Sequence, residues 1–105
     1  MTTGEIKAII AAIDPAAKHY TSSKSGDAFT VWAEYRRIMP EGADREEYGW
    51  AFEVDRYVHE SVEEDAIADA IEEAFAQNDR ISFTHEVEYD REGGYVRHIF
   101  DCEGI

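Results

Sequence analysis

Two runs of alternating apolar and polar residues close the sequence, and a turn with two adjacent glycines separates them. Because successive side chains of a strand point to opposite faces, the pattern predicts a β-hairpin over 81–102, with strands at 81–90 and 95–102. A four-residue turn over 91–94 makes each face uniform, whereas a slip by one residue would exchange the faces. One face is then acidic, with Glu88 opposite Arg97. The other face carries Phe83, His85, Val87, Tyr89, Val96, His98, Phe100 and Cys102.

Two stretches have the spacing of amphipathic helices. A stripe of isoleucines predicts the first helix over Glu5–Ile13, and Thr2 lies three residues before Glu5, as in a capping box. The second helix is predicted over 61–77, where Ser61 and Glu64 repeat the capping-box spacing and acidic residues occupy the first turn. The two apolar stripes are Ile6, Ile9, Ile10 and Ile13, and Ile67, Ala70, Ile71, Ala74 and Phe75. Each helix has a single apolar side, so we expect both to dock on one face of a sheet.

Two further segments are predicted to form an antiparallel pair of strands. In the strand at 28–36, the apolar phase consists of Phe29, Val31 and Tyr35. Trp32 falls on the polar phase of this strand, and we interpret it as an exposed contact residue. In the strand at 48–58, one face carries Tyr48, Trp50, Phe52 and Val54, and the other carries Glu53 and Asp55.

These elements predict one α+β domain over residues 1–105, in the order α-β-β-α-β-β. We expect a four-stranded, mostly antiparallel sheet with the two helices packed on one face. Residues 17–27 are mostly polar and lack a period, so they are predicted to be a flexible loop. No apolar run approaches the length of a membrane helix, and the first residues lack the features of a signal peptide, so we expect residence in the cytoplasm.

The net charge of −14 comes entirely from the second part of the chain. Residues 1–45 hold six basic and six acidic residues, whereas residues 46–105 hold four basic and eighteen acidic ones. Binding to the outside of duplex DNA relies on lysines and arginines that neutralise phosphates, so this composition argues against a sequence-specific DNA-binding protein. It favours a soluble protein, a basic protein partner, or a surface that does not adhere to nucleic acid.

No group of residues has the spacing of a catalytic or metal-binding site. His85 and His98 are diagonal neighbours on the hairpin, but no third metal ligand has a clear spacing, and packed histidines are the simpler interpretation. Cys102 is the only cysteine and lies between Asp101 and Glu103, which disfavours a reactive thiolate. We therefore expect no enzyme activity, no metal and no cofactor.

The second part of the chain resembles a known family. It contains the run Phe52-Glu53-Val54-Asp55-Arg56-Tyr57, a short helix over Asp65–Phe75, and then Ile81-Ser82-Phe83 and Glu88-Tyr89-Asp90-Arg91-Glu92-Gly93-Gly94-Tyr95-Val96-Arg97-His98-Ile99-Phe100. In order and spacing these segments, with a first strand over 29–35, resemble the small tail-terminator and tail-completion (head–tail neck) proteins of long-tailed bacteriophages and prophages. The resemblance covers about residues 28–102.

The resemblance implies a structural protein without enzyme activity. Proteins of this family assemble as a ring, commonly a hexamer, at the head-proximal end of the tail, where the ring ends tail growth and joins tail to head. The implied partners are other copies of the chain, tail-tube proteins and head-connector proteins. The implied location is the host cytoplasm during assembly and then the tail or neck of the virion. A channel lined with carboxylates would let DNA pass without binding it.

A closed ring needs two different complementary surfaces on each subunit. The near-neutral first part offers Trp32, Arg36, Arg37 and Arg45 as candidates for the subunit interface. The candidates for an acidic channel face are Glu63, Glu64, Asp65, Asp69, Glu72 and Glu73. The alternative hypothesis is an acidic inhibitor or DNA mimic that binds the basic site of a partner protein.

Overall fold

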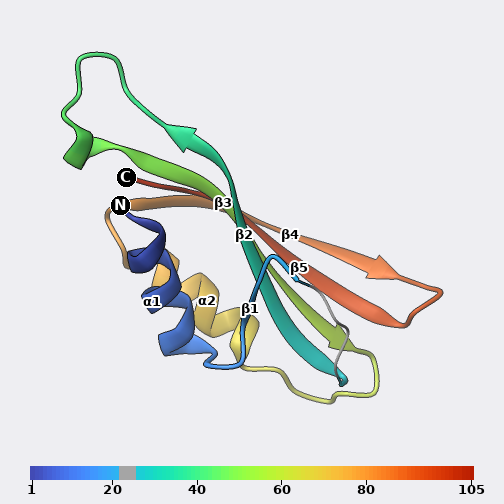
Figure 1. Ribbon diagram of the computed structural model, residues 1–105. Helices are drawn as coiled ribbons and strands as arrows, with labels where there is room; N and C mark the ends of the chain where they lie inside the picture. The colour runs from blue at the N-terminus through green and yellow to red at the C-terminus, as the bar shows by residue number, and fades with distance from the viewer. Residues whose placement is uncertain (22–25) are drawn as a thin grey trace.

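A computed structural model of the protein describes residues 1–21 and 26–105. In these residues two helices pack against a five-stranded mixed sheet, so the α+β class is confirmed (Figure 1). The sheet has the strand order β1-β2-β3-β5-β4, with β1 parallel to β2 and the other neighbours antiparallel. The elements are α1 (Thr3–Ile13), β1 (Lys18–His19), β2 (Ala28–Ile38), the 3₁₀ helix η1 (Arg45–Glu47), β3 (Gly49–His59), α2 (Ile67–Ala76), β4 (Ile81–Asp90) and β5 (Tyr95–Gly104). The prediction of four strands was therefore wrong by one.

The additional strand, β1, lies inside the segment 17–27 that was predicted to be a flexible loop. A two-residue strand is too short to show a period in the sequence. It is held by its side chains: the ring of His19 stacks on Trp32 with centroids 4.0 Å apart, and its Nε2 lies 2.7 Å from a carboxylate oxygen of Glu34. The loop prediction is thus wrong for Lys18 and His19, and its residues 22–25 lie outside the described residues.

Both helices lie on the same face of the sheet, as predicted (Figure 1). Helix α1 has the predicted capping box, in which the Thr2 hydroxyl accepts from the Glu5 amide at 3.1 Å and the Glu5 carboxylate accepts from the Thr2 amide at 3.2 Å. Its isoleucine stripe faces inward, with Ile6 and Ile10 fully buried. Local sequence signals therefore determine this helix correctly.

Helix α2 begins at Ile67 and not at Ser61, so the predicted capping box of Ser61 and Glu64 is wrong. The Ser61 amide instead donates to the Nδ1 atom of His59. Asp65 forms an ion pair with the buried Arg56 of β3. It also accepts a hydrogen bond from the Ala68 amide at 3.4 Å. The acidic residues 63–65 consequently precede the helix rather than occupying its first turn.

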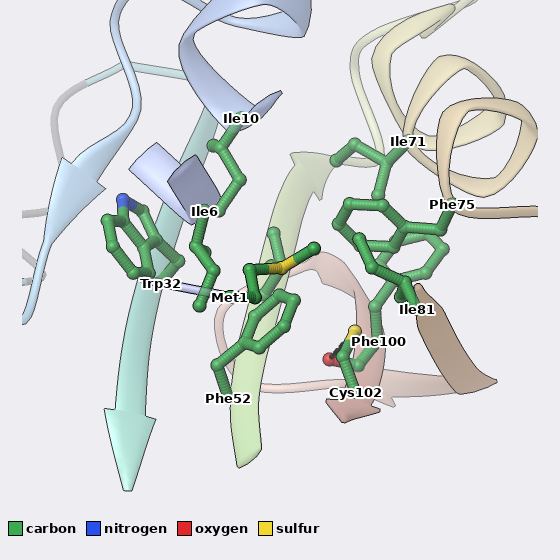
Figure 2. Close-up of a cluster of buried hydrophobic side chains, with 11 residues drawn as sticks. Met1, Ile6, Ile10, Trp32, Phe52, Ile71, Phe75, Ile81, Phe100 and Cys102 are labelled. Carbon is green, nitrogen blue, oxygen red and sulfur yellow. Dashed lines mark hydrogen bonds between the residues drawn. The ribbon is translucent and has the colours of Figure 1, made fainter. Parts of the chain in front are cut away.

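The core lies between the helices and the middle of the sheet, and Figure 2 shows its side chains. Phe75 of α2 packs edge-on against Phe52 of β3 and Phe100 of β5, with ring centroids 6.0 and 6.1 Å apart. The predicted inward face of β3 is confirmed, because Phe52 and Val54 are completely buried. The buried cluster comprises Met1, Ile6, Ile10, Trp32, Phe52, Val54, Ile71, Phe75, Ile81, Phe100 and Cys102.

Strand β2 has the opposite phase to the predicted one. Thr30 and Trp32 point toward the helices and are buried, whereas Phe29, Val31 and Tyr35 lie on the other face. Trp32 is only 3% exposed, so its interpretation as an exposed contact residue is wrong. The polar residue Thr30 can be buried on the helix side because its hydroxyl accepts a hydrogen bond from the buried Arg56. A bulge at Glu34–Arg36 then shifts the register along the rest of the strand.

Arg56 of β3 connects both helices to the sheet. It is 7% exposed and donates to the Asp65 carboxylate at 2.7 and 3.2 Å. Its Nη1 also donates to Asp14 at 3.4 Å and to the Thr30 hydroxyl at 3.1 Å. Because Asp14 caps the end of α1 and Asp65 precedes α2, one guanidinium fixes the position of both helices.

The hairpin register is confirmed, with Phe83 opposite Cys102, His85 opposite Phe100 and Glu88 opposite Arg97. The predicted apolar face is buried only in part, because Val87 and Tyr89 are 58% and 53% exposed. The reason is visible in Figure 1, where the tip of the β4–β5 hairpin extends away from both helices.

Candidate interaction surface

One face of the sheet carries no helix in the described part of the chain, and we call it the open face (Figure 1). Because β3 and β5 direct Phe52, Val54 and Phe100 toward the helices, the residues between them point to the open face. The open face combines apolar, acidic and a few basic side chains. It includes Phe29, Val31, Ala33, Tyr35 and Arg36 of β2, Ala51, Glu53, Asp55, Tyr57 and His59 of β3, Tyr95, Arg97, Ile99, Asp101 and Glu103 of β5, and Ser82, Thr84, Glu86, Glu88 and Asp90 of β4.

Arg97 is the basic centre of this face. Its guanidinium lies 2.9 Å from Asp55, 3.4 Å from Glu53 and 3.5 Å from Glu88. It also lies over the ring of Tyr57, at 5.7 Å from the centroid. Three carboxylates therefore share one arginine, and the cluster keeps an excess of negative charge. Within it, the Oδ1 atom of Asp55 and the Nε atom of Arg97 are buried and have no hydrogen-bond partner among residues 1–21 and 26–105.

The surroundings of this cluster shift the pKa values of two of its members. Burial and the neighbouring Asp55 charge raise the pKa of Glu53, and Arg97 offsets this only in part. Burial likewise raises the pKa of Tyr57. An added positive charge at this position would therefore be favoured by the open face.

A second group of contacts on the open face crosses from β2 to β5 over Ala51. The Tyr35 hydroxyl donates to Asp101 at 2.6 Å, and Arg36 pairs with Glu103 at 3.0 Å. The side chain of Ala51 is small enough to leave room for both bridges and is itself fully covered. The bond to Asp101 and burial together raise the pKa of Tyr35 to about 12.

The predicted interface residues do not form one patch. Trp32 lies in the core and is not available to a partner. Arg36 points to the open face, whereas Arg37 lies on the helix side, where its guanidinium stands 4.8 Å from the Trp50 ring and 5.4 Å from the Tyr48 ring. Arg45 is exposed on η1, in the connection between β2 and β3. Arg36 and Arg37 thus flank one end of β2 on both faces.

The predicted acidic residues also divide into groups. Asp65 is paired with Arg56, and although burial opposes it, this pairing holds the pKa of Asp65 below its usual value. Asp65 is therefore not part of an exposed acidic surface, contrary to the prediction. Glu63 and Glu64 are exposed before α2, and the exposed acidic residues of the helix itself are Asp69, Glu72 and Glu73.

His85, His98 and Cys102 belong to the packing of the hairpin. His85 lies 2.9 Å from both His98 and Glu72, and burial together with His85 lowers the pKa of His98. Across residues 1–21 and 26–105, no three or more His, Cys, Asp or Glu side chains are arranged to hold a metal ion. Cys102 is buried, and burial raises the pKa of its thiol well above the usual range. None of the helices in those residues is long and apolar enough to span a bilayer.

Comparison of the sequence with models of known protein families and with curated proteins gave no match.

Proposed function

We propose that the chain is a structural subunit of a bacteriophage or prophage virion, of the tail-terminator or tail-completion type. Copies of it would form a ring, with six subunits as the expected number, at the head-proximal end of the tail. The ring would end tail growth and join the tail to the head by contacts with tail-tube and head-connector proteins. The proposal starts from the resemblance of residues 28–102 to that class of proteins.

The observation that carries the proposal is the open face of the sheet. A sheet usually buries at least one face and often both, and here Phe29, Val31 and Tyr35 lie on the face that no helix of the described residues covers. The acidic cluster around Arg97 on the same face favours an additional positive charge, as argued above. Apolar side chains beside unbalanced charges are typical of a surface that binds another protein.

The distribution of charge supports a role next to moving DNA. The exposed residues Glu63, Glu64, Asp69, Glu72 and Glu73 lie together on and just before α2, and no lysine or arginine occurs from position 57 to 79. In the proposed ring these carboxylates face the central hole. They repel phosphates, so that DNA passes without binding.

A gene deletion with complementation tests the proposal. In the phage or prophage that encodes the chain, we expect its deletion to give filled heads that lack tails and tails of irregular, excessive length. The protein supplied from a plasmid should restore infectious particles. Normal joined particles without the protein would refute the proposal, and a stable complex of the monomer with a nuclease would favour the alternative, a DNA mimic.

A further inference from the structure

We propose that neighbouring subunits continue each other's sheet, with β4 of one copy pairing in antiparallel fashion with residues 34–38 of β2 in the next copy. This inference rests on the ring proposed above and specifies its interface. It is argued from the two outer strands of the sheet, which differ in length, exposed side chains and charge.

The outer edge of β4 is the first of the two surfaces. β4 pairs only with β5, so over its whole length, Ile81–Asp90, one side of its backbone has no strand partner in the described residues. Val87 and Tyr89 are more than half exposed on this strand, beyond the end of the helices. Proteins that remain monomeric usually shorten, cover or bend such an edge. A long, straight edge with exposed apolar side chains is suited to pairing with another strand.

The outer edge of β2 is the second surface. β1 pairs with β2 only opposite Val31 and Trp32, and the Tyr20 amide adds one hydrogen bond to the Trp32 carbonyl. The C-terminal part of this edge, residues 34–38, has no strand partner in the described chain. Tyr35 is 57% exposed here, and Met39, immediately after the strand, is 61% exposed. Four of the six large apolar side chains that are prominently exposed thus lie at the two edges.

The charges at the two edges are complementary. β4 carries Glu86, Glu88 and Asp90, and of these only Glu88 has an ion-pair partner in the described residues. The free part of β2 carries Arg36 and Arg37, one on each face of the sheet. Opposite charges on neighbouring strands stabilise a pair, and like charges destabilise it. Contact of β4 with β2 is therefore favoured over contact of β4 with a second β4.

The strand directions also fit a closed ring. β3 runs antiparallel to β2, β5 antiparallel to β3, and β4 antiparallel to β5, so β4 and β2 run in opposite directions within a subunit. A neighbour related by rotation about an axis inclined to the strands presents its β2 antiparallel to β4 and displaced along it. The displacement places residues 86–90 of β4 opposite residues 34–38 of the neighbour, instead of residues 81–83, which are level with residues 34–37 within a subunit. The contact joins two different surfaces, and such a contact repeats from subunit to subunit until the ring closes.

Cysteine cross-linking measures this contact directly. The native Cys102 is buried, so introduced surface cysteines react selectively. The double variant Val87→Cys/Arg37→Cys places one thiol on each edge, on the helix side of the sheet. In particles assembled from this variant by complementation, a short bis-maleimide should give a ladder of linked subunits that ends at the closed ring. Each single variant should give no linked subunits.

A linked dimer from Val87→Cys alone would show that β4 contacts β4 of the neighbour. Particles that carry the ring of the double variant but show no linked subunits would place the interface elsewhere. Either result overturns the inference. Should the double variant not assemble, Glu88→Cys/Arg36→Cys makes the same test on the open face. Charge reversal provides a second measurement. Glu86→Lys/Glu88→Lys and Arg36→Glu/Arg37→Glu should each abolish infectious particles, whereas the quadruple variant should restore them.

Circular dichroism checks that each variant is folded. If the folded quadruple variant does not restore infectious particles, the inference is also overturned. These results are separable from failure of the proposed function. If particles assemble normally without the protein, the ring itself is refuted. If particles require the protein but its edges do not cross-link or exchange charges, only the interface is wrong.

Discussion

Replacement of Arg56 by methionine should be among the most damaging single changes in the sheet. The side chain is 9% exposed and makes ion pairs with Asp65 and Asp14 and a hydrogen bond to Thr30. Methionine keeps most of the volume but leaves two largely buried carboxylates without a counter-charge. Removing one partner from a buried ion pair typically costs about 3–5 kcal/mol. For a domain of this size, each kcal/mol lowers the melting temperature by about 4–8 °C, so we expect a fall of more than about 10 °C.

The assay is urea and thermal unfolding followed by circular dichroism, with Arg36→Met as the matched control. Arg36 also pairs with a carboxylate, but both partners are more than half exposed, so its loss should cost less than about 1 kcal/mol. A triple variant, Arg56→Met with Asp65→Asn and Asp14→Asn, should recover part of the loss because the unpaired charges are removed. A cost below about 1 kcal/mol for Arg56→Met would refute the assignment of this residue as the link between helices and sheet.

Further predictions concern the core, the acidic surface and three ionisable groups. Ile71→Ala and Phe52→Ala should each lower the free energy of unfolding by about 2–5 kcal/mol in urea titrations, whereas a loss under about 1 kcal/mol would show that the core is misplaced. The pKa of Asp65 in the folded chain is lower than its ordinary value of 3.8, so the ionised Asp65 stabilises the fold fully above pH 3.8 and this stabilisation is lost as the pH falls further. The free energy of unfolding, measured from pH 5 to pH 2, should therefore fall less steeply in Asp65→Asn. Tyr35 should ionise only near pH 12 in an ultraviolet titration, and Asp101→Asn should lower that value. The Cys102 thiol should resist a thiol reagent in the native protein and react after unfolding in urea. Sodium chloride should raise the melting temperature of the isolated chain by screening its acidic residues, and a steady decrease would contradict this.

The sequence predicts best where the determining interactions are local. The hairpin register follows from the alternation of residues around Gly93 and Gly94, and Gly94 adopts the positive φ that such a turn requires. The capping box of α1 involves residues three apart, Thr2 and Glu5. In both cases the pattern and the structure-forming contact lie in the same short stretch.

The sequence fails where distant residues decide the outcome. The start of α2 depends on Asp65, whose partner Arg56 lies on β3. The phase of β2 depends on Arg56 as well, because its hydrogen bond allows Thr30 to be buried. β1 is too short to be recognised, and it is held by the contacts of His19 with Trp32 and Glu34. A single arginine therefore accounts for two of these three errors in the fold.

The candidate interaction surface was predicted only in outline. Arg36 and Arg37 were identified from the sequence as interface residues, but their placement on opposite faces follows from the bulge at Glu34–Arg36. The hairpin was predicted, but the order of the strands in the sheet was not, so the sequence did not place β4 at the edge of the sheet. Strand order depends on contacts between distant segments, which periodicity does not encode.

Electron microscopy of tail tubes incubated with the purified protein tests the central proposal most directly. The tubes are those of the phage or prophage that encodes the chain, assembled in its absence. We predict a closed ring on one end of each tube, with a mass that is a small multiple of the 12.0 kDa subunit, and no further elongation of capped tubes when tube protein is added. Bare tube ends, or tubes that elongate as fast with the protein as without it, would contradict the proposal.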